Sequence, residues 1–205
     1  MKKRIIQITN SILLFFIILT LSPVNAQARI APLDVSSVNY TITNVVLVSD
    51  RILEFDLYLK DTDAGQPFEL SIIQAGVLVN SEIINGGNIT TAVVPGFSDL
   101  IAAQQLTTAI WAKGPTTSII KITPKIGPGP GNGTKIKTTG QGTRICRVRI
   151  TNSVPFAKAR PNLAFCFASV PYPTKVFQYI GRVGTQVTTT SSNCFSEGAN
   201  PVLNE

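Results

Sequence analysis

Histidine is absent from this sequence of 205 residues. Without it, neither a Ser-His-Asp triad nor a Cys-His nucleophile pair can form, and the commonest metal ligand of proteins is missing. Carboxylates are the one class of general base present in quantity, with 11 Asp and Glu residues. The sequence therefore predicts a protein that is not an enzyme, and any catalytic alternative must rely on carboxylates.

Cysteine is also scarce. Cys146, Cys166 and Cys194 are the only three, so at most one disulfide can form within the chain. If residues 144–151 and 163–169 pair as a hairpin, the register that buries one face of each strand does not place Cys146 opposite Cys166. We expect buried thiols, with a bridge from Cys194 to one of the other two cysteines as the alternative.

No cysteine stands directly after the apolar segment near the N-terminus, which argues against a lipoprotein anchor. That segment, residues 11–21, is shorter than the ~20 apolar residues of a membrane-spanning helix. A basic head precedes it, Pro23 ends it, and small residues stand at Val24 and Ala26. This pattern predicts a secretory signal peptide over residues 1–26, cleaved after Ala26 or, as second choice, after Ala28. We expect residues 27–205 to form one domain, secreted or at the cell surface, with no stable membrane span.

The two signs of charge are separated along the chain. Residues 27–100 hold three cations and nine acids, whereas residues 101–205 hold twelve cations and two acids. Since such segments usually interleave in a two-sheet fold, we favour a self-complementary surface, and a charged binding face is the alternative. Cations this scattered, in a chain predicted to be exported, argue against a nucleic-acid partner.

Apolar and polar residues alternate at period two in several segments, which is typical of half-buried strands. In the clearest case, Leu53, Phe55, Leu57 and Leu59 share one face. Turn residues separate the segments, and the Gly/Pro run at 127–133 is expected to cap a long hairpin. An antiparallel β-sandwich of about nine strands is therefore predicted, with a single helix at residues 98–106 capped by Ser98. The predicted strands are residues 40–49, 52–59, 69–78, 89–94, 107–111, 118–123, 144–151, 163–169 and 175–180.

Glu54 and Asp56 form the one carboxylate pair with a spacing relevant to catalysis. Two residues apart on one strand face, they stand near the lower end of the ~5 to 9.5 Å window that glycoside hydrolysis requires. No aromatic-rich groove accompanies them. A solvated strand face is the favoured interpretation, and a carboxylate-dependent glycoside hydrolase is the remote alternative.

Asp61, Asp63 and Gly65 resemble the start of a calcium loop, because calcium prefers several oxygens from a tight turn. The loop is incomplete: the position of the invariant glycine is Gln66, and that of the closing glutamate is Ile72. An ordinary turn is favoured, no cofactor is expected, and calcium at Asp61 and Asp63 is the alternative.

Aromatic residues make up 7% of the chain, an ordinary share. Trp111, Tyr58, Tyr172 and Tyr179 are the candidates for stacking on sugar rings. Packing in the core or at a sheet edge is the favoured interpretation of these side chains.

Several stretches together resemble an N-terminal module of multidomain proteins exported by the bacterial type IX secretion system. They are residues 53–63, 67–70, 74–80, 140–151 and 171–175. Such modules are similar to cohesins and cellulose-binding-type sandwiches, so the resemblance implies a nine-stranded cohesin-like jelly roll. It also implies docking of another protein through a sheet face or binding of polysaccharide on an aromatic face. The chain departs from the type IX pattern in having no sorting domain after Cys194, and no planar row of aromatics is evident.

These observations predict a secreted, non-enzymatic binding or scaffolding module. An envelope or extracellular protein is the expected partner, and polysaccharide is the alternative.

Overall fold

The computed structural model describes residues 37–63, 65, 67–167, 172–181, 183–187 and 200–204, with the backbone alone for 185–187. The predicted signal peptide and Cys194 lie outside these residues. The described residues form an all-β fold of ten strands and two short 3-10 helices, η1 and η2, and contain no α-helix, which confirms the predicted β-sandwich. None of the described segments forms an apolar helix of membrane-spanning length. The elements are β1 Val38–Ser49, β2 Ile52–Asp61, β3 Leu70–Asn80, η1 Ser81–Ile84, β4 Ile89–Val94, η2 Ala102–Gln104, β5 Ala109–Ala112, β6 Thr117–Ile122, β7 Thr143–Asn152, β8 Ala164–Phe165, β9 Lys175–Ile180 and β10 Val183–Val187.

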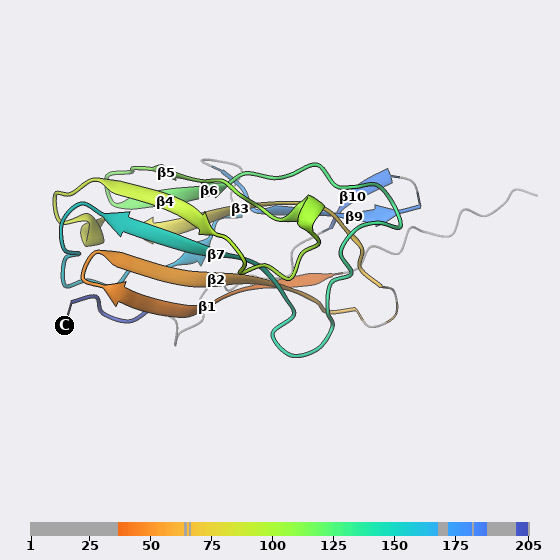
Figure 1. Cartoon of the computed structure of the whole chain (residues 1–205), viewed down its shortest axis with the longest axis horizontal. Helices are drawn as coiled ribbons and strands as arrows, with labels where there is room; N and C mark the ends of the chain where they lie inside the picture. The colour runs from red at the N-terminus through yellow and green to blue at the C-terminus, as the bar shows by residue number, and fades with distance from the viewer. Residues whose placement is uncertain are drawn as a thin grey trace, which may run out of the picture. The chain divides into compact units, whose positions relative to one another are not determined.

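Two antiparallel sheets face each other across a shared core (Figure 1). The four-stranded sheet has the order β1-β2-β7-β4, and the six-stranded sheet has the order β10-β9-β3-β6-β5 with β8 paired to β3. Neighbouring strands are often distant in sequence, as β2 and β7 are, so each sheet joins the acidic and the basic halves of the chain.

Core-facing and outward-facing side chains alternate along β2 as predicted. Leu53, Phe55, Leu57 and Leu59 point into the core and are at most 2% exposed. Their cross-strand neighbours on β7 are also buried, among them Val148 opposite Phe55. Burying these side chains stabilises the fold by roughly 1.5 to 3 kcal/mol each. The opposite face of β2 therefore points away from the core.

The long strand β3 organises the six-stranded sheet. Its first half pairs with β9 and its second half pairs with β6. Ile73, Ala75, Val77 and Val79 are buried in the core. Because side chains alternate along a strand, the residues between them line the outer face of the sheet. These outward residues are Ile72, Gln74, Gly76, Leu78 and Asn80.

Three predicted elements differ from the structure. Residues 98–106 contain only the short helix η2, because the Ser98 hydroxyl bonds to the Leu100 amide and the Ile145 carbonyl instead of capping a helix. Within the predicted strand 163–169, the described residues 163–167 do not pair with β7: β8 lies in the other sheet, against β3. The run 127–133 caps no hairpin either, since it connects β6 of one sheet to β7 of the other.

A tenth strand, β10, was missed. Gly184 interrupts its apolar pattern, and the strand is held as a hairpin partner of β9 after Gly181, whose φ of 62° suits a tight turn.

Candidate functional site

The outer face of the four-stranded sheet carries a cluster of ion pairs, which we call the ion ladder: Glu54 and Asp56 on β2, with Arg144, Arg147 and Arg149 on β7. Asp56 lies directly opposite Arg147, and Glu54 lies opposite Arg149. Arg147 binds Asp56 in a bidentate manner, with Nε to Oδ1 at 2.7 Å and Nη2 to Oδ2 at 2.9 Å. The Nε of Arg149 donates to Glu54 Oε1 at 2.7 Å. The acids and arginines of the ion ladder, which come from the two halves of the chain, thus neutralise each other.

Two further side chains enclose the ion ladder. The Phe97 ring covers the guanidinium of Arg147, with 4.0 Å between the guanidinium carbon and the ring centroid. Asn44 donates to Asp56 Oδ2 at 2.8 Å, and the Asp56 side chain is fully buried. Burial alone would raise the pKa of Asp56, but the hydrogen bonds and the arginine charges outweigh it and hold the pKa below its ordinary value.

This arrangement bears on the predicted carboxylate pair. A glycosidase acid needs a raised pKa and open access to substrate. Asp56 has a lowered pKa and no solvent exposure, and Glu54 is held by Arg149. The polar face of β2 is also less solvated than expected, because the arginines and Phe97 cover it. The geometry of the ion ladder is that of a structural network.

The predicted calcium residues lie at the end of β2. Asp61 is 1% exposed, and its two carboxylate oxygens accept hydrogen bonds from the backbone amides of Asp63 and Phe68. Burial raises the pKa of Asp61. Lys135 and Lys137 line the same small hollow, and their ammonium groups pair with Glu69 and Asp99. Within the described part of the chain no cluster of three metal-ligating side chains occurs, and calcium binding stays a prediction for titration calorimetry.

Trp111 and Tyr58 lie apart from the other two aromatic candidates. Trp111, on the short edge strand β5, is partly buried and packs against the core. Tyr58 lies on the outer face of β2, opposite Arg144, beside the ion ladder. Neither contributes to the outer face of the six-stranded sheet.

Tyr172 lies on that outer face, over β3 and β6. Its carbonyl oxygen lies so close to Gly76 that a Cβ at residue 76 would collide with it. Only glycine, which has no Cβ, allows this close approach. Its hydroxyl donates a long hydrogen bond, 3.4 Å, to the Ile122 carbonyl, and Lys121 Nζ lies 6.0 Å from its ring centroid. Because both the main chain and the hydroxyl contact the sheet, the side chain lies along the sheet surface.

Tyr179 lies on the same face, nearer the start of β3. From β9 its side chain crosses β3 at Ser71, and its hydroxyl accepts a hydrogen bond from the Gly129 amide at 2.9 Å. Gly127 lacks a Cβ that would collide with this hydroxyl. Tyr179 therefore also lies along the sheet, half-buried and anchored at its far end.

The structure thus brings together two of the four predicted aromatics. With Phe177, which lies beside Ile72 on the neighbouring strand, they form what we call the aromatic face. Ser71 and Gly76 are five residues apart on β3, so the two tyrosine contacts are separated by about 17 Å along the strand. The aromatic face is defined by Ile72, Gln74, Lys121, Tyr172, Phe177 and Tyr179.

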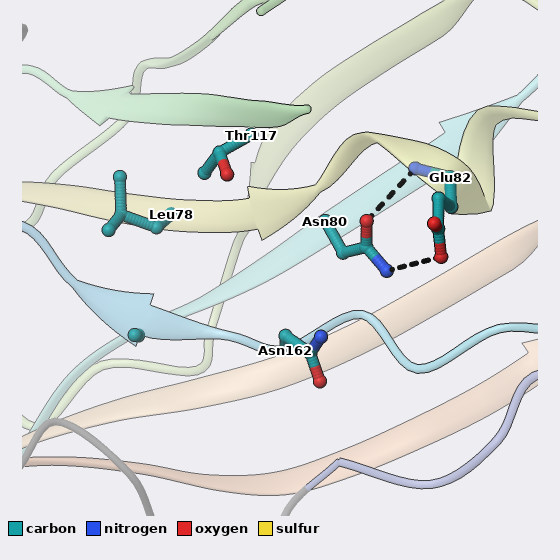
Figure 2. Close-up of a pocket in the computed structure, with 6 residues that line it drawn as sticks. Leu78, Asn80, Glu82, Thr117 and Asn162 are labelled. Atoms are coloured by element: carbon teal, nitrogen blue, oxygen red, sulfur yellow. Dashed lines mark hydrogen bonds between the residues drawn. The ribbon is translucent and has the colours of Figure 1, made fainter. Parts of the chain in front are cut away.

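A hollow of about 400 Å³ lies at the far end of the same sheet face, where β3 ends (Figure 2). Two amides, a carboxylate, a hydroxyl and two aliphatic side chains line it. Sequence reasoning missed these residues, because they come from three separate segments and match no motif. The lining residues are Leu78, Asn80, Glu82, Thr117, Asn162 and Ala164.

Two of the cysteines are in the described part of the chain, and both are buried, as expected. Cys146 lies on β7, opposite Leu57, as a free thiol, and burial raises its pKa to about 12. Cys166 lies beyond β8 at the other sheet, so the two do not face each other as hairpin neighbours.

No family model matches the sequence, and a search of curated proteins found no relative. Among solved structures, endoglucanase CelQ from Clostridium thermocellum complexed with cellotriose is 14% identical, with a TM-score of 0.41 over 77% of this chain and 26% of that chain. The same enzyme complexed with cellobiose and cellotriose is 12% identical, with a TM-score of 0.40 and the same coverage. The chain spans about a quarter of the length of the endoglucanase chains that it matches.

Proposed function

We propose that this chain is a non-enzymatic binding module, secreted or held at the cell surface, that binds polysaccharide through the aromatic face. One observation carries the proposal: Tyr172 and Tyr179 lie along one sheet face with both hydroxyls tied to backbone groups. An anchored ring loses little freedom on binding, and preorganisation of this kind favours affinity.

The surrounding side chains suit a polar ligand. Gln74 and the cations Lys121 and Lys175 are only partly buried on this face. They supply hydrogen-bond donors beside the rings. Aromatic surface with a few placed polar groups is the common composition of ligand sites.

A protein partner is the second candidate, and the exposed aliphatic surface on the same sheet favours it. Ile110 on β5 is 53% exposed and, as its neighbours Ala109 and Trp111 face the core, it points outward. Docking of a protein through this sheet would match the cohesin-like resemblance of the sequence. Fold alone licenses neither partner, so the two candidates are separated by experiment.

The test measures retention of the full chain on insoluble cellulose, chitin and peptidoglycan, together with binding to a glycan array. Tyr172→Ala and Tyr179→Ala are each expected to weaken binding about tenfold, the loss that corresponds to about 1.4 kcal/mol. Tyr58→Ala, the same substitution on the opposite sheet, is the matched control and is expected to bind normally. If the native chain binds no glycan, but a pull-down from envelope extract recovers a partner that Tyr172→Ala loses, the protein candidate replaces the glycan.

A further inference from the structure

We infer that the hollow at the end of β3 holds one neutral sugar residue of the glycan bound by the aromatic face. This inference rests on the proposed glycan-binding function. It assigns a role to residues that lie outside the aromatic face and contribute no aromatic ring.

Polar atoms without protein partners face the hollow. The side chains of Asn162 and Thr117 form no hydrogen bond with any described residue, and both are exposed. Glu82 uses only Oε2, which accepts a hydrogen bond from Asn80 at 3.2 Å, so Oε1 remains available. Figure 2 shows these side chains around the open space, together with Leu78. The hollow therefore offers a carboxylate acceptor, a hydroxyl, and an amide that both donates and accepts.

Hydrogen bonds of the Asn80 side chain hold part of the lining in place. Asn80 fixes Glu82 from two sides, since its Oδ1 accepts from the Glu82 amide at 3.1 Å and its Nδ2 donates to the carboxylate. The same Nδ2 also donates to the Arg160 carbonyl at 3.0 Å. Asn162 adopts a φ of 46°, in the left-handed region that asparagine tolerates better than most residues. A site built on a strand end and capped in this way needs little rearrangement to bind.

The chemistry of the lining selects the ligand class. A pyranose presents hydroxyls at its edge and C–H groups on its faces. The polar atoms of Glu82, Thr117 and Asn162 match the hydroxyls, while Leu78 and Ala164 provide apolar contact. Glu82 is the single charge in the lining, so it disfavours an anionic sugar. It also supplies too few carboxylates for a divalent cation, which prefers several oxygen ligands.

The hollow continues the line of the two tyrosines. Tyr179 crosses β3 at Ser71, Tyr172 meets it at Gly76, and the hollow begins at Leu78 and ends beyond Asn80. The stretch from Ser71 to Asn80 spans about 30 Å along the strand. An extended oligosaccharide that runs parallel to β3, over the tyrosine rings, would therefore reach the hollow.

The test compares affinities of the full chain for cellohexaose, laminarihexaose and chitohexaose by titration calorimetry. Thr117→Val and Glu82→Gln are expected to lower the affinity for the hexasaccharide that binds by about tenfold each. Thr116→Val makes the same chemical change one residue away, outside the lining, and is expected to leave affinity unchanged. Since all three positions are exposed, melting temperatures are expected to stay within a degree or two of the native value.

The outcomes separate the two proposals. Weaker binding by the hollow variants, with Thr116→Val unaffected, supports the sugar site. Native affinity in both hollow variants, while Tyr172→Ala binds weakly, overturns the sugar site and leaves the aromatic face standing. An equal loss in Thr116→Val also overturns it. If the native chain binds none of the three hexasaccharides and no glycan on the array, both proposals fall.

Discussion

The outer faces of the two sheets use their polar side chains in opposite ways. On the four-stranded sheet, Glu54 and Asp56 are matched to arginines of β7, and Phe97 covers the guanidinium of Arg147. On the six-stranded sheet, the hydroxyls of the tyrosines are tied down but their rings stay partly exposed, and the polar atoms of Asn162 and Thr117 have no described partner. On the first face the charged groups largely satisfy one another, although Arg144 Nε is buried without a hydrogen-bond partner in the described part of the chain. On the second face, ordered polar groups that reach the surface are available for a ligand. The contrast predicts that substitutions on the four-stranded face change mainly stability, whereas substitutions on the six-stranded face change mainly ligand binding.

The largest expected effect is on the ion ladder. Asp56→Ala leaves the partly buried guanidinium of Arg147 and the Asn44 amide without their acceptor. We expect the free energy of unfolding to fall by roughly 2 to 4 kcal/mol, less than the upper range for buried pairs because Arg147 is 22% exposed. Urea denaturation measures the loss, and glycan affinity of the folded fraction is expected to be unchanged. Glu54→Ala, whose partner Arg149 is 44% exposed, is the milder comparison at about 1 kcal/mol. Equal losses of unfolding free energy in the two variants would show that Asp56 stabilises the fold no more than Glu54 does.

Gly76→Ala is expected to have the next largest effect on stability. It is also the one substitution expected to change both stability and glycan binding. A Cβ at this position collides with the Tyr172 carbonyl oxygen, a backbone atom that cannot rotate away. We expect a loss of about 1 to 3 kcal/mol, typical of overpacking, together with weaker glycan binding because Tyr172 is displaced. Gly184→Ala is the control, since its new Cβ meets only the Ser71 hydroxyl, which can turn aside. Unchanged stability and binding in Gly76→Ala would show that the position of Tyr172 is not fixed by this contact.

Acid is expected to weaken the four-stranded sheet first. The folded pKa of Asp56 lies below its unfolded value of 3.8, so its contribution is fully present above about pH 5 and is lost as the pH falls through 3.8 toward the folded pKa. Glu69 and Asp99 have lowered pKa values and act with the same sign, although burial opposes their hydrogen bonds and lysine partners. Stability measured between pH 6 and about pH 3 should therefore decline, and the decline should be shallower in Asp56→Ala. If stability falls equally with pH in the native chain and in Asp56→Ala, Asp56 is not a main source of the acid sensitivity.

The smallest effect is expected from Tyr179→Phe, which keeps the ring and removes the acceptor of the Gly129 amide. Loss of one partly exposed hydrogen bond costs about 0.5 to 1 kcal/mol. Hydrogen exchange at Gly129 should accelerate by about two- to fivefold for a loss of that size, while glycan affinity changes little. A loss of binding as large as that of Tyr179→Ala would show that the hydroxyl, and not the ring, contacts the ligand.

Much of the fold could be predicted from local pattern. The alternation of apolar and polar residues predicts β2, and short apolar segments predict β4 and β9. The predicted bounds 89–94 and 175–180 match β4 and β9. The helix at 98–106 failed for a tertiary reason: Ser98 bonds to Ile145 and Asp99 is held by Arg144, contacts that no local propensity can anticipate.

The site was predictable only in part. Tyr172 and Tyr179 were selected as aromatics, but their common face depends on strand pairings that bring β9 beside β3. Gly76, in the middle of an apolar strand pattern, was the available signal for the close approach of another segment. Nothing in the sequence links Asn162 to Thr117, because a hollow formed by separate segments has no linear motif.

The pairing of β2 with β7 also determines when the chain can fold. Asp56 and Arg147 are 91 residues apart, and β2 lies between β1 and β7 in its sheet. In the order of synthesis the acids of β2 come first, and their arginine partners on β7 follow about 90 residues later. Contacts of such long sequence separation form slowly. The ion ladder can therefore be complete only after the chain has been synthesised beyond Arg149.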